Sequence, residues 1–247
     1  MLSDKISLVV LDMTGTTMVD NGEVTKCFQE ACSQNGLNVT PEQIKGLTGW
    51  SKMAMFRSFW RKKLGADHPD IEDKDEETFY TFTDIMEAYF ENNDQHPTEG
   101  ALEVMEWLRE NDVKVVLTTG FYREVTDILL ENLGWDEGLD ENYMSVGDSI
   151  IDMSIASDEV LKGRPQPFMI QKAMKQFGIT DPKKVIKVGD TPVDLAAGRN
   201  AKCLYTLAVT NGAYTEAELA KLDNDGLLPT VGHLKSFLQK KLQLKGG

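Results

Sequence analysis

The chain has 247 residues, of which 41% are hydrophobic and 27% are charged. These are the proportions of a globular protein, and they exclude wholesale disorder. Its 40 acidic and 26 basic side chains give a net charge of −14, which argues against nonspecific binding to nucleic acid or to an anionic membrane. An anionic small substrate is compatible with this charge, because it needs only a local cluster of cations.

Short apolar runs rich in β-branched residues predict buried parallel strands. The runs cover residues 6–11, 113–117, 185–188 and 204–209. Helical patterns lie between them, at 101–110, 123–133, 167–177 and 192–200. Strands that alternate with helices predict an α/β fold, in which a doubly wound parallel sheet carries helices on both faces.

Residues 21–96 interrupt this alternation, because they carry helical patterns only. The patterns cover 24–35, 41–45, 51–64 and 76–91, and the acidic stretch 67–77 is expected to be a solvated connection. We therefore expect an all-helical cap domain of residues 21–96, inserted into a core of residues 1–20 and 97–247. It would lie over the carboxyl edge of the sheet, where open α/β sheets bind ligands.

Cysteine usage and the N-terminal residues predict a cytoplasmic protein. The cysteines form no CxxC pair and are expected to be reduced thiols; they are Cys27, Cys32 and Cys203. The first residues lack the pattern of a secretory signal, and no apolar stretch reaches the roughly 18 residues of a membrane span. We expect no membrane and no nucleic acid among the partners.

Three of the predicted strands end near polar side chains, at Asp12, Thr119 and Asp190. The carboxyl ends of parallel strands share one edge of the sheet, so these side chains predict a single site. After Asp12, Gly15 permits a sharp bend, and the following N–H groups can cradle an anion. A carboxylate here can attack phosphorus, bind a hard cation, or do both. An ordinary Asp at the start of a loop is the alternative.

A second acidic segment runs from Asp190 to Asp194. Thr191 suits a helix N-cap and Pro192 the first helical position, so Asp194 is also explained as a capping-box partner. A carboxylate that faces Asp12 would suit Mg²⁺, which takes one or two carboxylates, waters and substrate oxygens. The sequence predicts Asp190 as a metal ligand and leaves the role of Asp194 open.

These segments resemble the motifs of the haloacid dehalogenase superfamily, over nearly the whole chain. The segment from Asp12 to Thr16 resembles the first motif, Thr119 the second, and Asp190 with Asp194 the fourth. The resemblance implies a Rossmann-like core with a helical cap, Mg²⁺ as cofactor and an aspartyl-phosphate formed on Asp12.

The same resemblance implies roles for the neighbouring residues. The backbone carbonyl of Thr14 would join Asp12 and Asp190 around the metal, with Asp194 in support. Thr16, Thr119 and Gly120 would bind the phosphoryl group.

Two departures from the superfamily pattern resemble one branch, phosphonoacetaldehyde hydrolase and its relatives. Thr14 stands where most members have a general acid and base Asp, and a hydroxyl does not usefully protonate a leaving alkoxide at neutral pH. Arg164 stands in place of the third-motif Lys, with Lys162 close by as the alternative, and would hold the phosphoryl group bidentately. The segment from Thr48 to Arg57 resembles the cap segment of that branch, which places Lys52 at its Schiff-base position.

The chemistry of that branch is coherent with these residues. Cleavage of a C–P bond leaves a carbanion, which an iminium on Lys52 accepts as an enamine. Lys52 would begin a helix if Ser51 is the cap, where the helix dipole and Arg57 would lower its pKa. An ordinary solvated lysine is the alternative. Met55 stands where phosphonatase proper has a proton-moving His, so the substrate need not be phosphonoacetaldehyde and another mechanism must supply the proton transfers.

The sequence therefore predicts a Mg²⁺-dependent hydrolase of a small phosphonate or phosphorylated metabolite, with Schiff-base assistance as an added hypothesis. One alternative is a phosphomonoesterase of the phosphoglycolate phosphatase type, which would not need Lys52. An alternative of another class is a noncatalytic sensor of a phosphate ligand. A homodimer is compatible with each of these.

Overall fold

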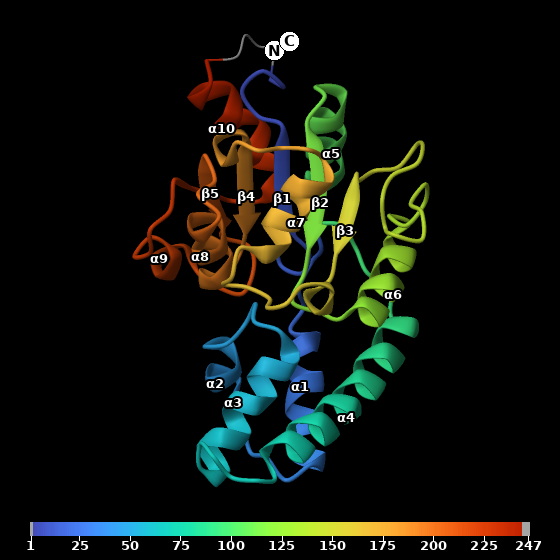
Figure 1. The fold of residues 1–247 in the computed structure, drawn as a ribbon, viewed down its shortest axis with the longest axis vertical. Helices are drawn as coiled ribbons and strands as arrows, with labels where there is room; N and C mark the ends of the chain where they lie inside the picture. Colours follow the sequence, from blue (N-terminus) through green and yellow to red (C-terminus); the bar gives the residue numbers. More distant parts are fainter. Residues whose placement is uncertain (1, 244–247) are drawn as a thin grey trace.

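The computed structural model describes residues 2–243, which form a parallel sheet with helices on both faces and a helical layer beyond one edge (Figure 1). The strand order is β3-β2-β1-β4-β5-β6, and every pairing is parallel. The strands are β1 (Leu8–Asp12), β2 (Lys114–Thr118), β3 (Met153–Ile155), β4 (Val185–Gly189), β5 (Tyr205–Val209) and β6 (Gly226–Leu228). The predicted α/β fold class is confirmed.

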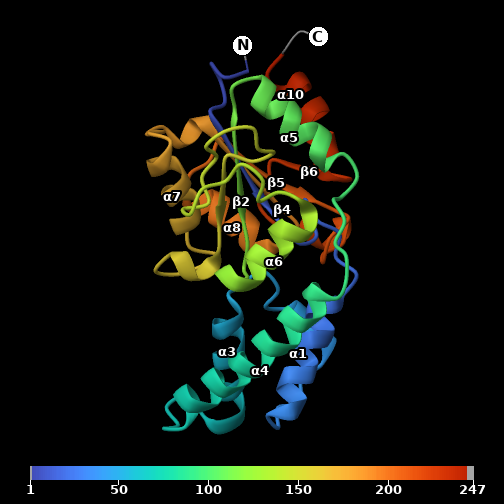
Figure 2. The ribbon, with the colours of Figure 1, turned by 90° about the vertical axis from the view of Figure 1, so that its right-hand side faces the viewer.

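Helices cover both faces of the sheet (Figure 2). On one face lie α5 (Ala101–Glu110), α6 (Arg123–Leu133) and α10 (Leu234–Lys241); on the other lie α7 (Phe168–Gln176) and α8 (Pro192–Asn200). Successive side chains of a strand point to opposite faces, so Val9 and Leu11 join the first core while Leu8 and Val10 join the second. The short helix α9 (Glu216–Leu219) follows β5.

The helical layer lies beyond the arrowheads of the strands, at the carboxyl edge of the sheet (Figure 1). It contains α1 (Glu23–Gln34), α2 (Pro41–Lys45), α3 (Lys52–Leu64) and α4 (Ile71–Glu91). Its core is aromatic: the rings of Phe28 and Phe56 stack at 4.1 Å, and Phe82 meets both edge-on at 5.8 and 5.6 Å. This layer is the helical cap expected from the sequence, and the limits 21–96 for it stay a prediction.

The acidic stretch 67–77 differs from its expected form as a solvated connection. Helix α4 begins at Ile71, so most of this stretch is helical. Asp75 is fully buried and forms an ion pair with Arg57 of α3, which gives the acidic turn a packing partner. Glu72 and Asp73 lie in the first turn, where the helix dipole favours negative charge.

Strands β3 and β6 were not predicted. Each has three residues, which is too short a run to show a strand period. The prediction of free thiols is confirmed, because all three cysteines are buried and unpaired within residues 2–243. No helix in that range has both the length and the apolar character that crossing a bilayer requires.

Candidate active site

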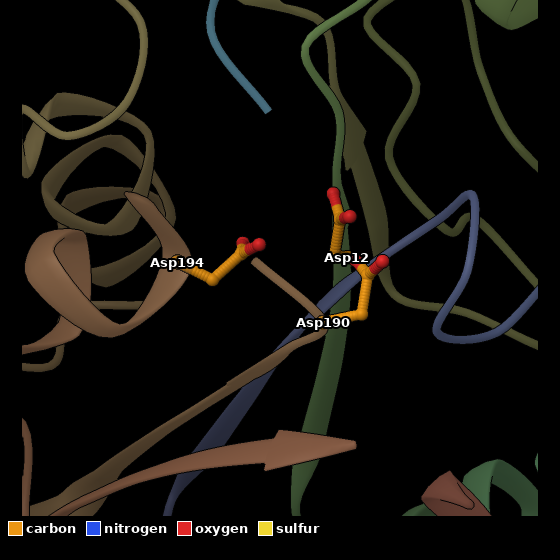
Figure 3. Close-up of side chains that lie close together, drawn as sticks. All are labelled: Asp12, Asp190 and Asp194. Carbon is orange, nitrogen blue, oxygen red and sulfur yellow. The ribbon is translucent and has the colours of Figure 1, made fainter. Parts of the chain in front are cut away.

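The carboxyl ends of β1 and β4 are neighbours at the point where the strand order reverses, which is where open α/β sheets form a crevice. Asp12 is the last residue of β1, and Asp190 directly follows β4. Asp194, in the first turn of α8, completes the group (Figure 3). One carboxylate oxygen from each of the three lies within 4.8 Å of the others. The fold thus brings together three acids from distant parts of the sequence, here named the acidic cluster.

The loop after β1 gives the acidic cluster its shape. The backbone N–H groups of Thr16, Thr17 and Met18 all donate to the carbonyl of Met13, at 2.9 to 3.0 Å. Gly15 has a φ of 81°, the left-handed region that favours glycine. A Cβ on Gly15 would lie 2.4 Å from Asp190 Oδ2, so the loop also needs glycine for space.

Asp190 is the acid of the cluster that has no ion pair within residues 2–243. Its Oδ2 accepts the backbone N–H of Ala213 at 2.7 Å, and the hydroxyl of Thr16 lies 3.5 Å from Oδ1. Burial, together with the charges of Asp12 and Asp194, raises the pKa of Asp190 well above its ordinary value. A positive charge beside this carboxylate would relieve that cost.

Two buried basic side chains form ion pairs with the other two acids of the cluster. Arg164 Nη1 donates to Asp12 Oδ1 at 2.6 Å and also to Asp194 Oδ1. Lys187 Nζ lies 2.9 Å from Asp194 Oδ1 and donates to Thr118 Oγ1 at 3.2 Å. Burial alone would raise the pKa of Asp194, but Arg164 and Lys187 overcome it and hold that pKa below the ordinary value. Burial raises the pKa of Asp12, against the pull of Arg164.

The contacts of Asp194 test one of its predicted roles, that of a capping-box partner. Thr191 is the N-cap of α8 and Pro192 its first residue, as predicted, but the Thr191 hydroxyl donates to the Asp194 carboxylate instead of capping the helix. The capping-box alternative is therefore wrong. Lys187 was not predicted as a site residue. A lysine inside an otherwise apolar strand is the sequence signal that could have identified it.

Lys52 is the first residue of α3, and the Ser51 hydroxyl caps this helix by accepting the N–H of Ala54. The Lys52 side chain is only 7% exposed, and its Nζ lies 4.9 Å from the centroid of the Phe121 ring. This burial excludes the solvated-lysine alternative. Burial and the charge of Arg164 lower the pKa of Lys52 to about 8, although Asp12 and Asp20 act in the opposite direction.

The predicted contribution of Arg57 to that shift is wrong. Arg57 lies five residues further along α3, and its guanidinium pairs with Asp75 on α4. An offset of five residues does not place two side chains on one face of a helix. Arg164, from the core, takes the place that was expected for Arg57.

A cavity of about 250 Å³ lies between the cap and the core. Its core wall includes Asp12, Thr14, Asp20, Thr119, Gly120, Arg164, Asp190, Thr191 and Ala213; its cap wall includes Val24, Phe28, Ile44, Lys45, Lys52 and Met55. Every predicted site residue lines this cavity except Thr16 and Asp194, which are fully buried behind it. The hydroxyl of Thr14 is buried and has no hydrogen-bond partner within the described chain.

Glycines let the cap approach the core closely over this cavity. A Cβ on Gly49 would lie 2.6 Å from Thr191 Oγ1, and Gly49 has a φ of 90°. On the opposite side, a Cβ on Gly120 would lie 2.9 Å from the carbonyl oxygen of Trp50. The cap loop therefore fits between the core loops that follow β2 and β4.

The site lies in the crevice where the strand order reverses, with a carboxylate at the end of a strand and a cluster of acids. Together with the inserted helical cap, these features are typical of one class of hydrolases. A family model described as haloacid dehalogenase-like hydrolase matches residues 6–202, and the chain belongs to this family. This membership does not favour the noncatalytic sensor.

The chain is also similar to particular members. It is 29% identical over 237 residues to phosphonoacetaldehyde hydrolase of Bacillus cereus, covering 89% of this chain and 83% of that protein. A bifunctional phosphonoacetaldehyde hydrolase/aminoethylphosphonate transaminase of Clostridioides difficile is 29% identical over 260 residues, covering 98% of this chain but 37% of that protein.

Solved structures share the fold. A hydrolase from Pseudomonas syringae superposes with a TM-score of 0.78 at 20% identity, covering 95% of this chain and 98% of the other. A phosphonoacetaldehyde hydrolase like protein from Oleispira antarctica gives 0.73 at 18% identity, covering 96% and 92%. These similarities support the architecture of core and cap.

Proposed function

We propose that the protein hydrolyses the C–P bond of a small 2-oxoalkylphosphonate, with Mg²⁺ as cofactor, Asp12 as the nucleophile and Lys52 as the amine that forms a Schiff base. One observation carries this proposal: a buried lysine whose pKa is lowered to about 8 lines the same cavity as a buried strand-end carboxylate. The similarity to phosphonoacetaldehyde hydrolases supports the choice of a carbonyl phosphonate.

The acidic cluster fits a hard divalent cation. Its three buried carboxylates carry one more negative charge than Arg164 and Lys187 neutralise, and Asp190 lacks an ion pair within residues 2–243. Asp12 and Asp190 would hold the ion, with the backbone carbonyl of Thr14 as a third donor. When bound, Mg²⁺ supplies positive charge to the phosphoryl oxygens and to the two carboxylates.

Residues of the core wall bind the phosphoryl group and attack phosphorus. Arg164 holds Asp12 through Nη1, which orients the carboxylate, and its guanidinium steadies the phosphoryl group. Thr119 and Gly120, directly after β2, bind the phosphoryl oxygens from the other side. Asp12 attacks phosphorus, the C–P bond breaks, and water later hydrolyses the aspartyl-phosphate.

Lys52, in the cap wall, reacts with the carbonyl group of the substrate, which is the carbonyl half of the reaction. The neutral amine of Lys52 adds to the carbonyl carbon, and loss of water gives an iminium. The electron pair of the breaking C–P bond moves into this iminium as an enamine, so no leaving alkoxide needs protonating. Protonation of the enamine at carbon and hydrolysis of the resulting iminium then release the carbonyl product and the Lys52 amine. With a pKa of about 8, about a quarter of the Lys52 amines are neutral at pH 7.5, against roughly 0.1% for an ordinary lysine.

Trapping with borohydride tests this proposal. Wild type incubated with 2-oxopropylphosphonate and sodium borohydride should form a covalent adduct, and peptide mass spectrometry should place it on Lys52. Lys52→Met should form none. Lys45→Met is the matched control, because Lys45 lines the same cavity and its loss should leave the adduct in place. An adduct on any other lysine, or none in wild type, would contradict the proposal.

A phosphomonoesterase is the second candidate. It is favoured by the phosphoryl-binding wall, because Asp12, Arg164 and Asp190 would serve an ester as well as a phosphonate. Phosphate release from an ester that persists in Lys52→Met would support it. Thr14 argues for slow turnover, because this position offers a hydroxyl and no carboxylate to a leaving alkoxide.

A further inference from the structure

Asp20 lies between β1 and α1, where the chain passes from the core into the cap. The two connections between core and cap run side by side here, since Met18 pairs with Pro97 and the N–H of Val19 donates to the carbonyl of His96 at 3.0 Å. Asp20 is one of the residues that line the cavity. Its Oδ1 accepts the N–H of Gly22 at 2.8 Å, which fixes the side chain. Its Oδ2 makes no hydrogen bond or ion pair to any residue between 2 and 243.

The other ionisable groups of the cavity already have partners or roles. Asp12 and Asp190 belong to the acidic cluster, and Arg164 is held by two of its acids. Lys45 pairs with Glu218, with Nζ 2.8 Å from Oε1. Among the described residues that line the cavity, Asp20 is therefore the only carboxylate outside the acidic cluster, and its charge acts on Lys52.

Schiff-base chemistry needs such a group. A carbonyl oxygen can leave as water only after it has gained two protons, and the amine must lose two. The side chains of Met55 and Phe121, which line the cavity near Lys52, carry no exchangeable proton. General acid–base catalysis works directly or through one water, so the acid need not touch the amine.

We propose that Asp20 is the general acid and base for the carbonyl half of the reaction, while the acidic cluster serves the phosphoryl half. This inference rests on the proposed function. Asp20 takes a proton from the Lys52 ammonium, and the neutral amine adds to the carbonyl. A second amine proton passes to the alkoxide. Asp20 then returns its proton to the resulting hydroxyl, which leaves as water. The iminium keeps one N–H and the positive charge, and Asp20 is again a carboxylate.

The variant Asp20→Asn tests the assignment, because an amide keeps the acceptor for the Gly22 N–H but cannot carry the proton. Borohydride trapping of 2-oxopropylphosphonate on Lys52 should slow by about 100-fold or more. Added formate or acetate should restore part of the rate. The melting temperature, and its rise on adding Mg²⁺, should stay as in wild type.

The matched control is Glu23→Gln. Glu23 is a buried acid near Asp20 that accepts the N–H of Asn21 at 2.8 Å, but it does not line the cavity. Its variant should trap substrate at the wild-type rate.

The direction of the effect separates proton transfer from simple electrostatics. Asp20 raises the pKa of Lys52, so removal of its charge alone would increase the neutral amine and speed trapping. Trapping in Asp20→Asn at or above the wild-type rate would overturn the inference, and so would an equal loss in Glu23→Gln. A wild type that never forms an adduct contradicts the proposed function itself, which is a different result.

Discussion

The Asp190 carboxylate is enclosed by two glycines as well as by the other acids. A Cβ on Gly212 would lie 2.3 Å from Asp190 Oδ2, in the same loop whose Ala213 N–H binds that oxygen. The close approach of this loop is what presents the carboxylate to Asp12. The sequence predicted Asp190 from its place after a strand, but it gave no sign of Gly212, because the approach depends on a loop far along the chain.

Gly212→Ala should therefore displace the Asp190 carboxylate and weaken Mg²⁺ binding by about tenfold, which corresponds to about 1.4 kcal/mol. Isothermal titration with Mg²⁺ measures this. Gly147→Ala is the control, because a Cβ on Gly147 has no atom within 4 Å. Equal Mg²⁺ affinity in the two variants would show that Asp190 does not bind the ion.

The lowered pKa of Lys52 predicts a pH profile. Burial disfavours the ammonium form, so the neutral amine becomes populated as pH rises through about 8 instead of through 10.5. The rate of borohydride trapping should rise from pH 6.5 and level off near pH 9. A rate that still climbs steeply above pH 10 would mean that the amine is solvated in solution.

At the scale of elements, α3 and α4 are joined by an unequal ion pair. Asp75 is fully buried and its Oδ1 has no hydrogen-bond partner within the described chain, whereas the Arg57 side chain is 44% exposed. The pairing explains why the sequence misplaced both residues. Arg57 is close to Lys52 along the chain but lies on another face of α3, and the sequence does not show which helix faces the acidic stretch.

Arg57→Ala should leave the buried Asp75 carboxylate without its ion-pair partner and lower the free energy of unfolding by about 3 kcal/mol or more. Adding Asp75→Ala to that variant should recover part of the loss, because the unpaired charge disappears. Urea unfolding of the two single variants and the double variant measures this. Losses that simply add would show that the pair is not coupled.

Helices α1 to α8 and four strands followed from hydrophobic period and β-branched runs, which are local properties, whereas α9 and α10 were not predicted. Apart from α4, their bounds agree with the prediction or differ from it by at most two residues, because fraying and caps decide the ends. The short strands β3 and β6 depend on a sheet that already exists beside them, which no local pattern can show.

In the whole molecule, an ion pair and a hydrogen bond connect the cap to the core beside the active site. Lys45, at the end of α2, pairs with Glu218 of the core, and the hydroxyl of Tyr214 donates to the Lys45 carbonyl. The same core loop carries Ala213, whose N–H binds Asp190. The sequence predicted that a cap would cover the site, but contacts between segments so far apart arise only in the folded chain.

Lys45→Met should weaken this connection and raise KM by about threefold, because an exposed ion pair contributes little. The kcat value should change less, since Lys45 has no part in the chemistry. Glu218→Gln should have the same effect, and the double variant should show no further loss. Independent effects of the two variants on KM would contradict a shared contact between cap and core.

In the proposed reaction, Lys52 makes C–P cleavage possible in a site whose nucleophile is Asp12. Phosphorus NMR of phosphate release from 2-oxopropylphosphonate and from propyl phosphate, in wild type and in Lys52→Met, tests it most directly. We predict that wild type cleaves the phosphonate in the presence of Mg²⁺ and that Lys52→Met loses this activity by about 100-fold or more. Phosphonate cleavage that survives in Lys52→Met, or a wild type that cleaves only the ester, would contradict the account.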